Sequence, residues 1–145
     1  MRRGLVSIAL ALSAAACAPR PPAYSFAGDH EVRNVERLIA TTPAVAGQNI
    51  TVTELQRGDS SSIALVQVRD REQPHVHTRY DLTVVVARGQ GTLWLNGIAL
   101  PMQRGDAAYI PKGTPHYFVN QGSEPAAAVV VFSPPFSGPD QQAVK

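Results

Sequence analysis

The chain has 145 residues, with 13 Lys and Arg against 11 Asp and Glu, and 44% of its residues are hydrophobic. Two of the basic residues, Arg2 and Arg3, stand near the N-terminus, and without them the charges balance. No basic stripe remains to argue for nucleic-acid binding, and no apolar span after the N-terminal one argues for a membrane-embedded protein. The length suits one domain with a hydrophobic core. Because Cys17 is the only cysteine, that domain has no disulfide.

The N-terminal segment has the layout of a secretory signal. Arg2 and Arg3 precede an apolar run, residues 5–12, that is too short to span a bilayer, and small residues follow it. Residues 14–17, AAAC, resemble a bacterial lipobox, in which Cys17 is lipidated and becomes the first mature residue. The alternative is a soluble secreted protein that is cleaved near the same place and carries an incidental cysteine.

We therefore expect a signal peptide over residues 1–16 and a lipid anchor at Cys17. The anchor would place the protein in the cell envelope, on the periplasmic side. Ala18 rather than an aspartate follows the cysteine, which by resemblance to Gram-negative lipoproteins favours the outer membrane. In this interpretation the lipid anchor is the protein's only contact with a membrane.

Residues 17–28 are expected to form a tether, because Pro19, Pro21 and Pro22 preclude a regular helix and favour an extended spacer. Apolar residues then recur at helical spacing and predict one amphipathic helix over residues 30–40, capped by Asp29. His30 falls in its first turn, where we expect a solvated surface histidine rather than a ligand.

From Asn49 onward the apolar period changes to two, which is typical of strands. Turn signals, among them Asn96-Gly97, separate the apolar segments. Many short strands without a strong helix indicate a sandwich or a barrel. The expected strands are residues 50–55, 61–68, 75–77, 82–87, 92–95, 98–102, 107–111, 116–120 and 126–133.

The end of the chain is expected to be loose. Pro134, Pro135 and Pro139 would end the last strand and leave a tail to Lys145. We find no internal repeat that would imply a second barrel. The sequence therefore predicts a single domain over residues 29–145, with a barrel core at about residues 48–133.

Three of the four histidines fall in two short segments. His75 and His77 are separated by one residue, so on a strand both side chains point to the same face. His116, which follows two proline-containing turns, would have to meet them from a second strand. Three neutral imidazoles suit a divalent transition metal such as Fe, Zn, Mn, Ni or Cu. The alternative is three packed, hydrogen-bonded core histidines.

The segment around His116 resembles the second motif of the cupin family, G-x5-P-x-G-x2-H-x3-N. Every fixed position of that motif is filled, by Gly105, Pro111, Gly113, His116 and Asn120. The resemblance extends over about residues 48–133. It implies an all-β fold, the double-stranded β-helix or jelly-roll barrel of cupins, here with one short N-terminal helix. Cupin barrels often pair, so the resemblance also implies a homodimer.

The first cupin motif is met only in part. The two histidines and Gly89 fit, but Arg69 stands where the motif has a leading glycine and Leu82 where it has a glutamate ligand. Asp81, next to Leu82, is the candidate for a fourth metal ligand if the turn after the histidines is tight. Strand alternation instead puts Asp81 at the rim, as a turn carboxylate paired with Arg79 or as a partner that fixes the tautomer of an imidazole.

An apolar wall is expected around the metal. By strand parity Leu82, Val84 and Phe118 would line this pocket, and ordinary core packing is the alternative for each of them. Tyr80 and Tyr109 are the candidates for catalytic proton transfer, with core or rim packing as the alternative. Three neutral ligands would leave the ion a local charge of +2, which acidifies bound water and favours an anionic substrate.

A cupin fold does not determine which reaction a protein catalyses, so two hypotheses about function remain. The first is a small metalloenzyme, of the oxygenase or Lewis-acid type, that acts on a small molecule. The second is a non-catalytic, envelope-anchored module that binds a small molecule or a metal. The expected partner is a small-molecule substrate or ligand, and no nucleic acid is expected.

Overall fold

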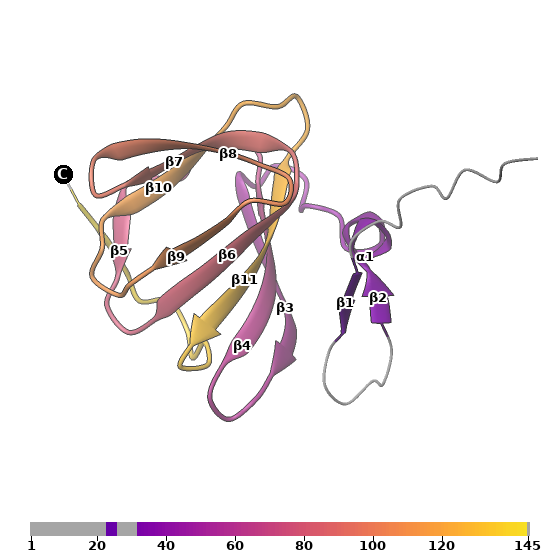
Figure 1. Cartoon of the computed structure of the whole chain (residues 1–145), viewed down its shortest axis with the longest axis horizontal. Coiled ribbons are helices and arrows are strands. Elements are labelled where there is room, and N and C mark those ends of the chain that lie inside the picture. Colours follow the sequence, from indigo (N-terminus) through magenta and orange to yellow (C-terminus); the bar gives the residue numbers. More distant parts are fainter. Residues whose placement is uncertain (1–22, 26–31, 145) are drawn as a thin grey trace, which may run out of the picture.

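The described part of the chain is a barrel of two five-stranded antiparallel sheets that face each other (Figure 1). The computed structural model describes residues 23–25 and 32–144. The first sheet, in spatial order, consists of β3 (Ile50–Arg57), β4 (Ser62–Val68), β11 (Ala126–Ser133), β6 (Asp81–Arg88) and β9 (Ala107–Ile110). The second consists of β12 (Gln141–Ala143), β5 (His75–His77), β10 (His116–Asn120), β7 (Gln90–Leu95) and β8 (Ile98–Gln103). The predicted all-β jelly-roll fold is confirmed.

Strand β11 and the middle of β6, residues 84–87, are apolar because both of their faces are covered. Leu82, Val130 and Phe132 belong to the core inside the barrel. On the outer face, Ala87 and Val129 belong to a second cluster under the helix. Side chains of a strand alternate between faces, so a strand that is buried on both faces is apolar at successive positions.

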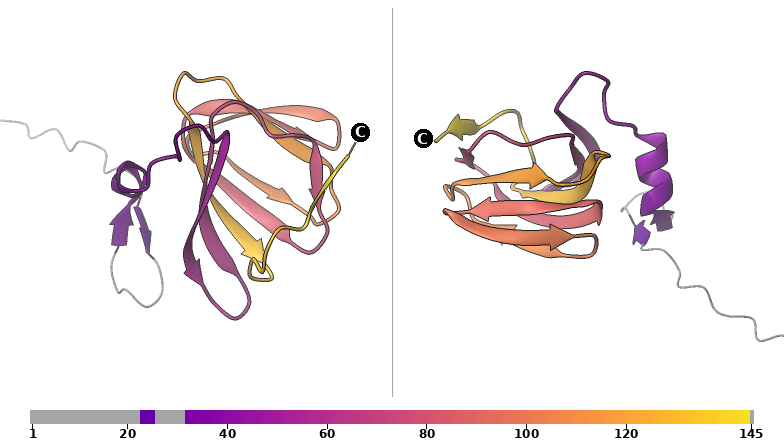
Figure 2. Two further views of the ribbon diagram at one scale, coloured as in Figure 1. Left: turned by 180° about the vertical axis from the view of Figure 1, so that it is seen from behind. Right: turned by 90° about the horizontal axis from the view of Figure 1, so that it is seen from above.

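The single helix of the described residues, α1 (Val35–Thr41), packs on the outside of the first sheet through Val35 and Ile39 (Figure 2). The prediction of a helix over residues 30–40 was wrong at its start. Val32–Asn34 is strand β2, which pairs with β1 (Ala23–Ser25) inside the predicted tether.

The helix begins late because Asn34 caps it. The Asn34 Oδ1 accepts a hydrogen bond from the backbone N–H of Arg37 at 3.1 Å, as an N-cap side chain does. The predicted cap Asp29, His30, Cys17 and the signal peptide lie outside the described residues. No helix among the described residues is long and apolar enough to cross a membrane.

The C-terminal segment is ordered against the barrel, so the expectation of a loose tail was wrong. Phe136 packs against the rings of Tyr80 and Phe132, with centroids 5.5 and 5.1 Å apart. The Tyr80 hydroxyl accepts a hydrogen bond from the Ser137 N–H at 2.8 Å and donates one to the carbonyl of Gly138 at 3.2 Å. The chain then adds β12 to the edge of β5. The prolines end the apolar pattern of the sequence after β11, but aromatic contacts and a short edge strand still hold this segment in place.

Candidate metal centre

The three motif histidines converge inside the barrel. His75 and His77 lie on β5, and His116 begins β10, where it stands directly opposite His75 in the antiparallel register. One ring nitrogen of each histidine lies within 4.8 Å of the corresponding nitrogens of the other two. All three side chains are buried, with 4–6% of each residue exposed. The arrangement is the one that strand alternation and the two motifs predicted.

The outer nitrogen of each ring is already occupied. The Nδ1 atoms of His75 and His116 lie 2.8 Å from the backbone carbonyl oxygens of Gln73 and Thr114. A carbonyl oxygen only accepts, so each Nδ1 must carry the hydrogen and donate it. The Nε2 of each ring is then unprotonated, and its lone pair faces the other histidines. Metal-binding histidines are held in this way in proteins, so the donor set fits a transition metal.

The third ring, His77, is held by a carboxylate. Its Nδ1 lies 2.6 Å from Oδ1 of Asp140, and Oδ2 of Asp140 accepts a hydrogen bond from the backbone N–H of Arg79 at 2.8 Å. The Asp140 side chain is only 1% exposed. Burial alone would raise the pKa of Asp140, but the hydrogen bonds from His77 and Arg79 and the attraction of His77 lower that pKa below its ordinary value. Asp140 therefore remains charged and fixes the ring of His77.

Asp140 was missed in the sequence because it falls in the segment that was expected to be loose. One signal could have pointed to it: Asp140 is the only acidic residue after Glu124.

Two turns of the second motif bring His116 to this place. The backbone N–H of Gly113 donates to the carbonyl of His77 at 2.7 Å, which ties the turn to the histidine strand. Gly113 has a φ of 78°, a left-handed conformation that a residue without Cβ adopts at no steric cost. Downstream, the side-chain amide of Asn120 donates to the carbonyls of Arg69 and Glu124 at 2.8 and 2.9 Å. The glycine and the asparagine of the motif are thus structural residues.

Burial keeps the imidazoles of His77 and His116 neutral. It lowers the pKa of His116 to about 4, although the hydrogen bond to Thr114 opposes the shift, and repulsion from the other two histidines adds to it. Burial also lowers the pKa of His77, against the opposing hydrogen bond and charge of Asp140. Both rings are therefore unprotonated at neutral pH and can accept a cation without first releasing a proton.

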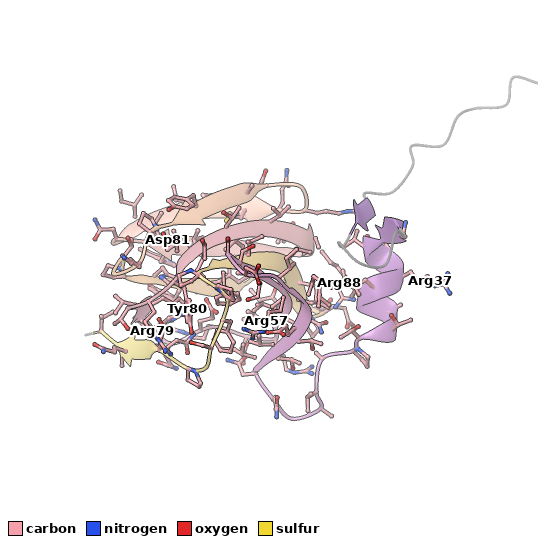
Figure 3. The ribbon with its side chains drawn as sticks, turned by 90° about the horizontal axis from the view of Figure 1, so that it is seen from below. Arg37, Arg57, Arg79, Tyr80, Asp81 and Arg88 are labelled. Carbon is pink, nitrogen blue, oxygen red and sulfur yellow. The ribbon has the colours of Figure 1, made fainter. Side chains whose placement is uncertain are left out.

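The polar groups of the other predicted site residues are bonded elsewhere or exposed on the surface. The Asp81 carboxylate accepts a hydrogen bond from the backbone N–H of Lys112 at 2.9 Å, and no carboxylate of the described residues joins the histidine group. Figure 3 shows Arg79 and Tyr80 beside the C-terminal segment. Tyr80 is 1% exposed and its hydroxyl is used there, whereas Tyr109 is 59% exposed on the outside of the barrel.

A cavity of about 270 Å³ opens next to the histidines. Leu82, Val84 and Phe118, the three residues expected to form a pocket, all line it. The rest of the wall is also mainly aliphatic and aromatic. Besides the histidines, the ionisable or amide side chains in the lining are those of Glu72 and Gln141. The cavity therefore combines an apolar body with a polar end at the candidate metal centre, as small-molecule sites usually do.

Glu72 is the second functional candidate that the sequence did not reveal. Its Oε2 accepts a hydrogen bond from the backbone N–H of Phe118 at 2.9 Å. Burial raises the pKa of Glu72, and the nearby His75 and the Phe118 hydrogen bond oppose that rise. In the sequence Glu72 lies between the expected strands 61–68 and 75–77, and its position three residues before His75 was the only hint.

The comparisons agree with this architecture. The family described as "Cupin domain" matches residues 62–132. An uncharacterized protein of Aquifex aeolicus is 34% identical over 115 residues, which are 79% of this chain and 93% of that protein. A Streptomyces PAC13 variant with uridine has a TM-score of 0.58 and 27% identity, over 70% of this chain and 82% of its own. A Klebsiella pneumoniae protein with a double-stranded β-helix domain has a TM-score of 0.63 and 21% identity, over 74% and 94%. With two facing sheets, both histidine segments in place and these relatives, the chain belongs to the cupin superfamily.

Proposed function

We propose that the protein binds a divalent transition metal through Nε2 of His75, His77 and His116 and is a metalloenzyme for a small molecule. The observation that carries the proposal is the hydrogen bonding of the three rings. Each Nδ1 is occupied by a protein acceptor, so three lone pairs are directed to one place. Packed core histidines would not need three separately fixed tautomers that leave the same nitrogen unprotonated.

The substrate class follows from the cavity. Its wall is mainly apolar, its volume is about 270 Å³, and its polar atoms are concentrated at the histidine end. We therefore propose a small molecule with an apolar body and an oxygen-bearing head group, which an anionic head would suit best because neutral imidazoles leave the charge of the ion uncompensated. The Streptomyces PAC13 structure with uridine supports a small-molecule ligand in a barrel of this kind.

A bound divalent ion would supply Lewis-acid or redox chemistry at the head group. The chain's own residues have three other tasks. The apolar wall excludes water from the body of the substrate. Asp140 holds His77 in one orientation. Glu72, with its raised pKa, can carry a proton next to the histidine end of the cavity and give it to or take it from the substrate.

The test is metal analysis combined with a turnover screen. Full-length protein purified without chelator or histidine tag should contain about one transition-metal ion per chain. A variant with His75→Ala, His77→Ala and His116→Ala should contain none and should lose any turnover. Iron in the wild-type protein would point to oxygen chemistry and zinc to Lewis-acid chemistry. Wild-type protein that takes up none of these metals would contradict the proposal.

A second candidate function is a non-catalytic binding module. The composition of the cavity wall favours it, because among the described residues Glu72 has the only carboxyl group that lines the cavity. Such a module would be stabilised by its ligand without converting it. Turnover that is lost in Glu72→Gln while the metal content stays the same would exclude this candidate, because binding alone needs no proton carrier.

For localisation we propose a lipoprotein anchored through Cys17 in the cell envelope. The support is the sequence alone: a short apolar run after Arg2 and Arg3, and a cysteine where a lipobox needs it. Wild-type protein should partition into the detergent phase of a membrane extract, and Cys17→Ser should abolish this partitioning. Equal partitioning of both proteins would contradict the lipid anchor.

A further inference from the structure

The C-terminal strand places one more side chain on the face of the histidines. In the antiparallel pairing of β12 with β5, Gln141 stands opposite His77, and Gln142 stands opposite Val76. Directly opposed residues of an antiparallel pair project to the same face of a sheet, and the next residue projects to the other face. Gln141 therefore shares the face of His75 and His77, and it lines the cavity, whereas Gln142 does not.

The Gln141 side chain reaches the metal-facing atom of His75. Its amide nitrogen lies 3.2 Å from Nε2 of His75, the ring nitrogen that remains after Nδ1 donates to Gln73. With metal–nitrogen bonds of about 2.0–2.1 Å, neighbouring ligand atoms in tetrahedral or octahedral coordination lie roughly 2.8–3.4 Å apart. The amide group is thus at the separation from His75 that an adjacent ligand would have.

The amide can present either of its two ends at this place. Facing an unprotonated Nε2, the NH₂ group donates, as the structure shows. A cation would repel the NH₂ group of Gln141. A half-turn of the amide about the last side-chain bond brings its carbonyl oxygen Oε1 to the same position. Amide carbonyl oxygens bind divalent ions in proteins.

The carboxylates near the histidines are committed elsewhere. The Asp140 carboxylate holds His77 and Arg79, Asp81 holds the backbone of Lys112, and Glu72 is bonded to the backbone of Phe118. None of them joins the group of converging ligand atoms among the described residues. Leu82 occupies the strand position at which the motif has its glutamate, and it offers only hydrocarbon.

We propose that Gln141 is a fourth protein ligand of the metal, bound through Oε1 and supplied by the C-terminal strand β12. The inference depends on the proposed binding of a transition metal to the three histidines. Because an amide is neutral, the ion keeps its full local charge of +2 beside the cavity. The same strand then contributes both the fourth ligand and, in the preceding residue Asp140, the group that orients His77.

The experiment titrates full-length metal-free protein in detergent with Co²⁺ alone, and records both the affinity against a competing chelator and the visible absorption of the bound ion. The variants are Gln141→Leu, which keeps the size but has no oxygen, and Gln141→Glu, which keeps an oxygen at the same reach. The matched control is Gln142→Leu, the same change on the opposite face of the same strand. Thermal unfolding of the metal-free variants checks that each is folded.

We expect Gln141→Leu to bind Co²⁺ roughly tenfold more weakly or worse and to change the absorption bands. Gln141→Glu should bind Co²⁺ more tightly than the wild type and also change the absorption bands, because it places a negative charge at the same reach, and Gln142→Leu should match the wild type. Wild-type affinity and an unchanged spectrum in Gln141→Leu would overturn the fourth ligand while leaving the three-histidine site intact. If Gln141→Leu is unfolded, the same unchanged affinity and spectrum in Gln141→Glu would overturn it. Failure of wild-type protein to bind Co²⁺ would overturn both proposals.

Discussion

His116 shows how a single buried residue makes the metal-free fold sensitive to pH. In the folded protein its pKa is about 4, whereas in the unfolded chain an imidazole titrates near 6.5. Between these two values the unfolded state binds the proton and the folded state does not. The contribution of His116 to the stability of the metal-free protein is therefore complete above pH 6.5, and it is lost as the pH falls toward 4.

We expect the free energy of unfolding of the metal-free protein to fall by up to about 1.4 kcal/mol per pH unit in that window from His116 alone. His77 adds to the loss, because its pKa is also lowered. Urea unfolding at a series of pH values, with chelator present, measures the slope. His116→Gln should make the slope shallower, and an identical slope in the variant would contradict the assignment.

Substitutions of Asp140 should distinguish a role in orienting the His77 ring from a general role in folding. Asp140→Ala leaves Nδ1 of His77 without its acceptor, so the ring is free to turn and to change tautomer. We expect metal affinity, measured with Zn²⁺ against a competing chelator, to fall about 10–100-fold.

Asp140→Asn, which keeps an oxygen acceptor, should recover part of this affinity. Asp59→Ala, a change at an exposed position between β3 and β4, should have no effect and serves as the control. Equal losses in Asp140→Asn and Asp140→Ala would point to a general structural effect instead of orientation of His77.

The histidines were predictable from the sequence, and their partners were not. Strand alternation places His75 and His77 on one face whatever the rest of the chain does. Asp140, in contrast, is 63 residues away from His77, and the contact exists only because β12 joins the edge of β5. Local patterns carry no information about such an encounter, so the groups that orient the ligands had to come from the structure.

At the scale of elements, Gly91 on β7 fixes the position of Phe118 on the neighbouring strand β10. A Cβ at position 91 would overlap both the Phe118 ring and the backbone oxygen of Val119, and the backbone oxygen cannot move away without breaking strand pairing. Phe118 lines the cavity, so the strain of a larger residue would be transmitted to the cavity wall.

We expect Gly91→Ala to destabilise the protein by about 1–3 kcal/mol, the usual cost of overpacking, and to change ligand binding in the cavity. Gly58→Ala is a suitable control, because its added Cβ would meet only the Ser61 oxygen at an ordinary 3.6 Å. Urea unfolding of the two variants makes the comparison. A neutral Gly91→Ala would show that β7 and β10 separate more easily than their register suggests.

Strand positions were predictable because the period of two is strong wherever one face is buried, and β4, β10 and β11 lie where it placed them. The start of helix α1 and strand β12 were not, because each depends on a competing interaction. Asn34 caps the helix, so the helix begins at Val35 and not at residue 30. Strand β12 has no apolar face of its own. Its hydrogen-bonding partner is the otherwise free edge of β5.

At the scale of the whole molecule, the candidate metal centre joins strands that are far apart in the sequence. β5 has only three residues, and within the described chain its pairing with β10 joins one residue pair, His75 with His116. An ion bound by all three histidines would link β5 to β10, and through Asp140 and Gln141 it would also hold the C-terminal strand. Metal binding should therefore stabilise the entire second sheet.

A ligand that binds the folded and not the unfolded chain stabilises by mass action, by about 2.7 kcal/mol when its free concentration is a hundred times Kd. We expect Zn²⁺ to raise the Tm of the metal-free protein by several degrees in differential scanning calorimetry. Mg²⁺ should not do so, because it prefers oxygen ligands and the converging atoms of the histidines are nitrogens. The triple variant His75→Ala, His77→Ala and His116→Ala should show no shift. If it gains as much stability from Zn²⁺ as the wild type does, the ion binds elsewhere on the chain, and the barrel encloses a cavity without a metal.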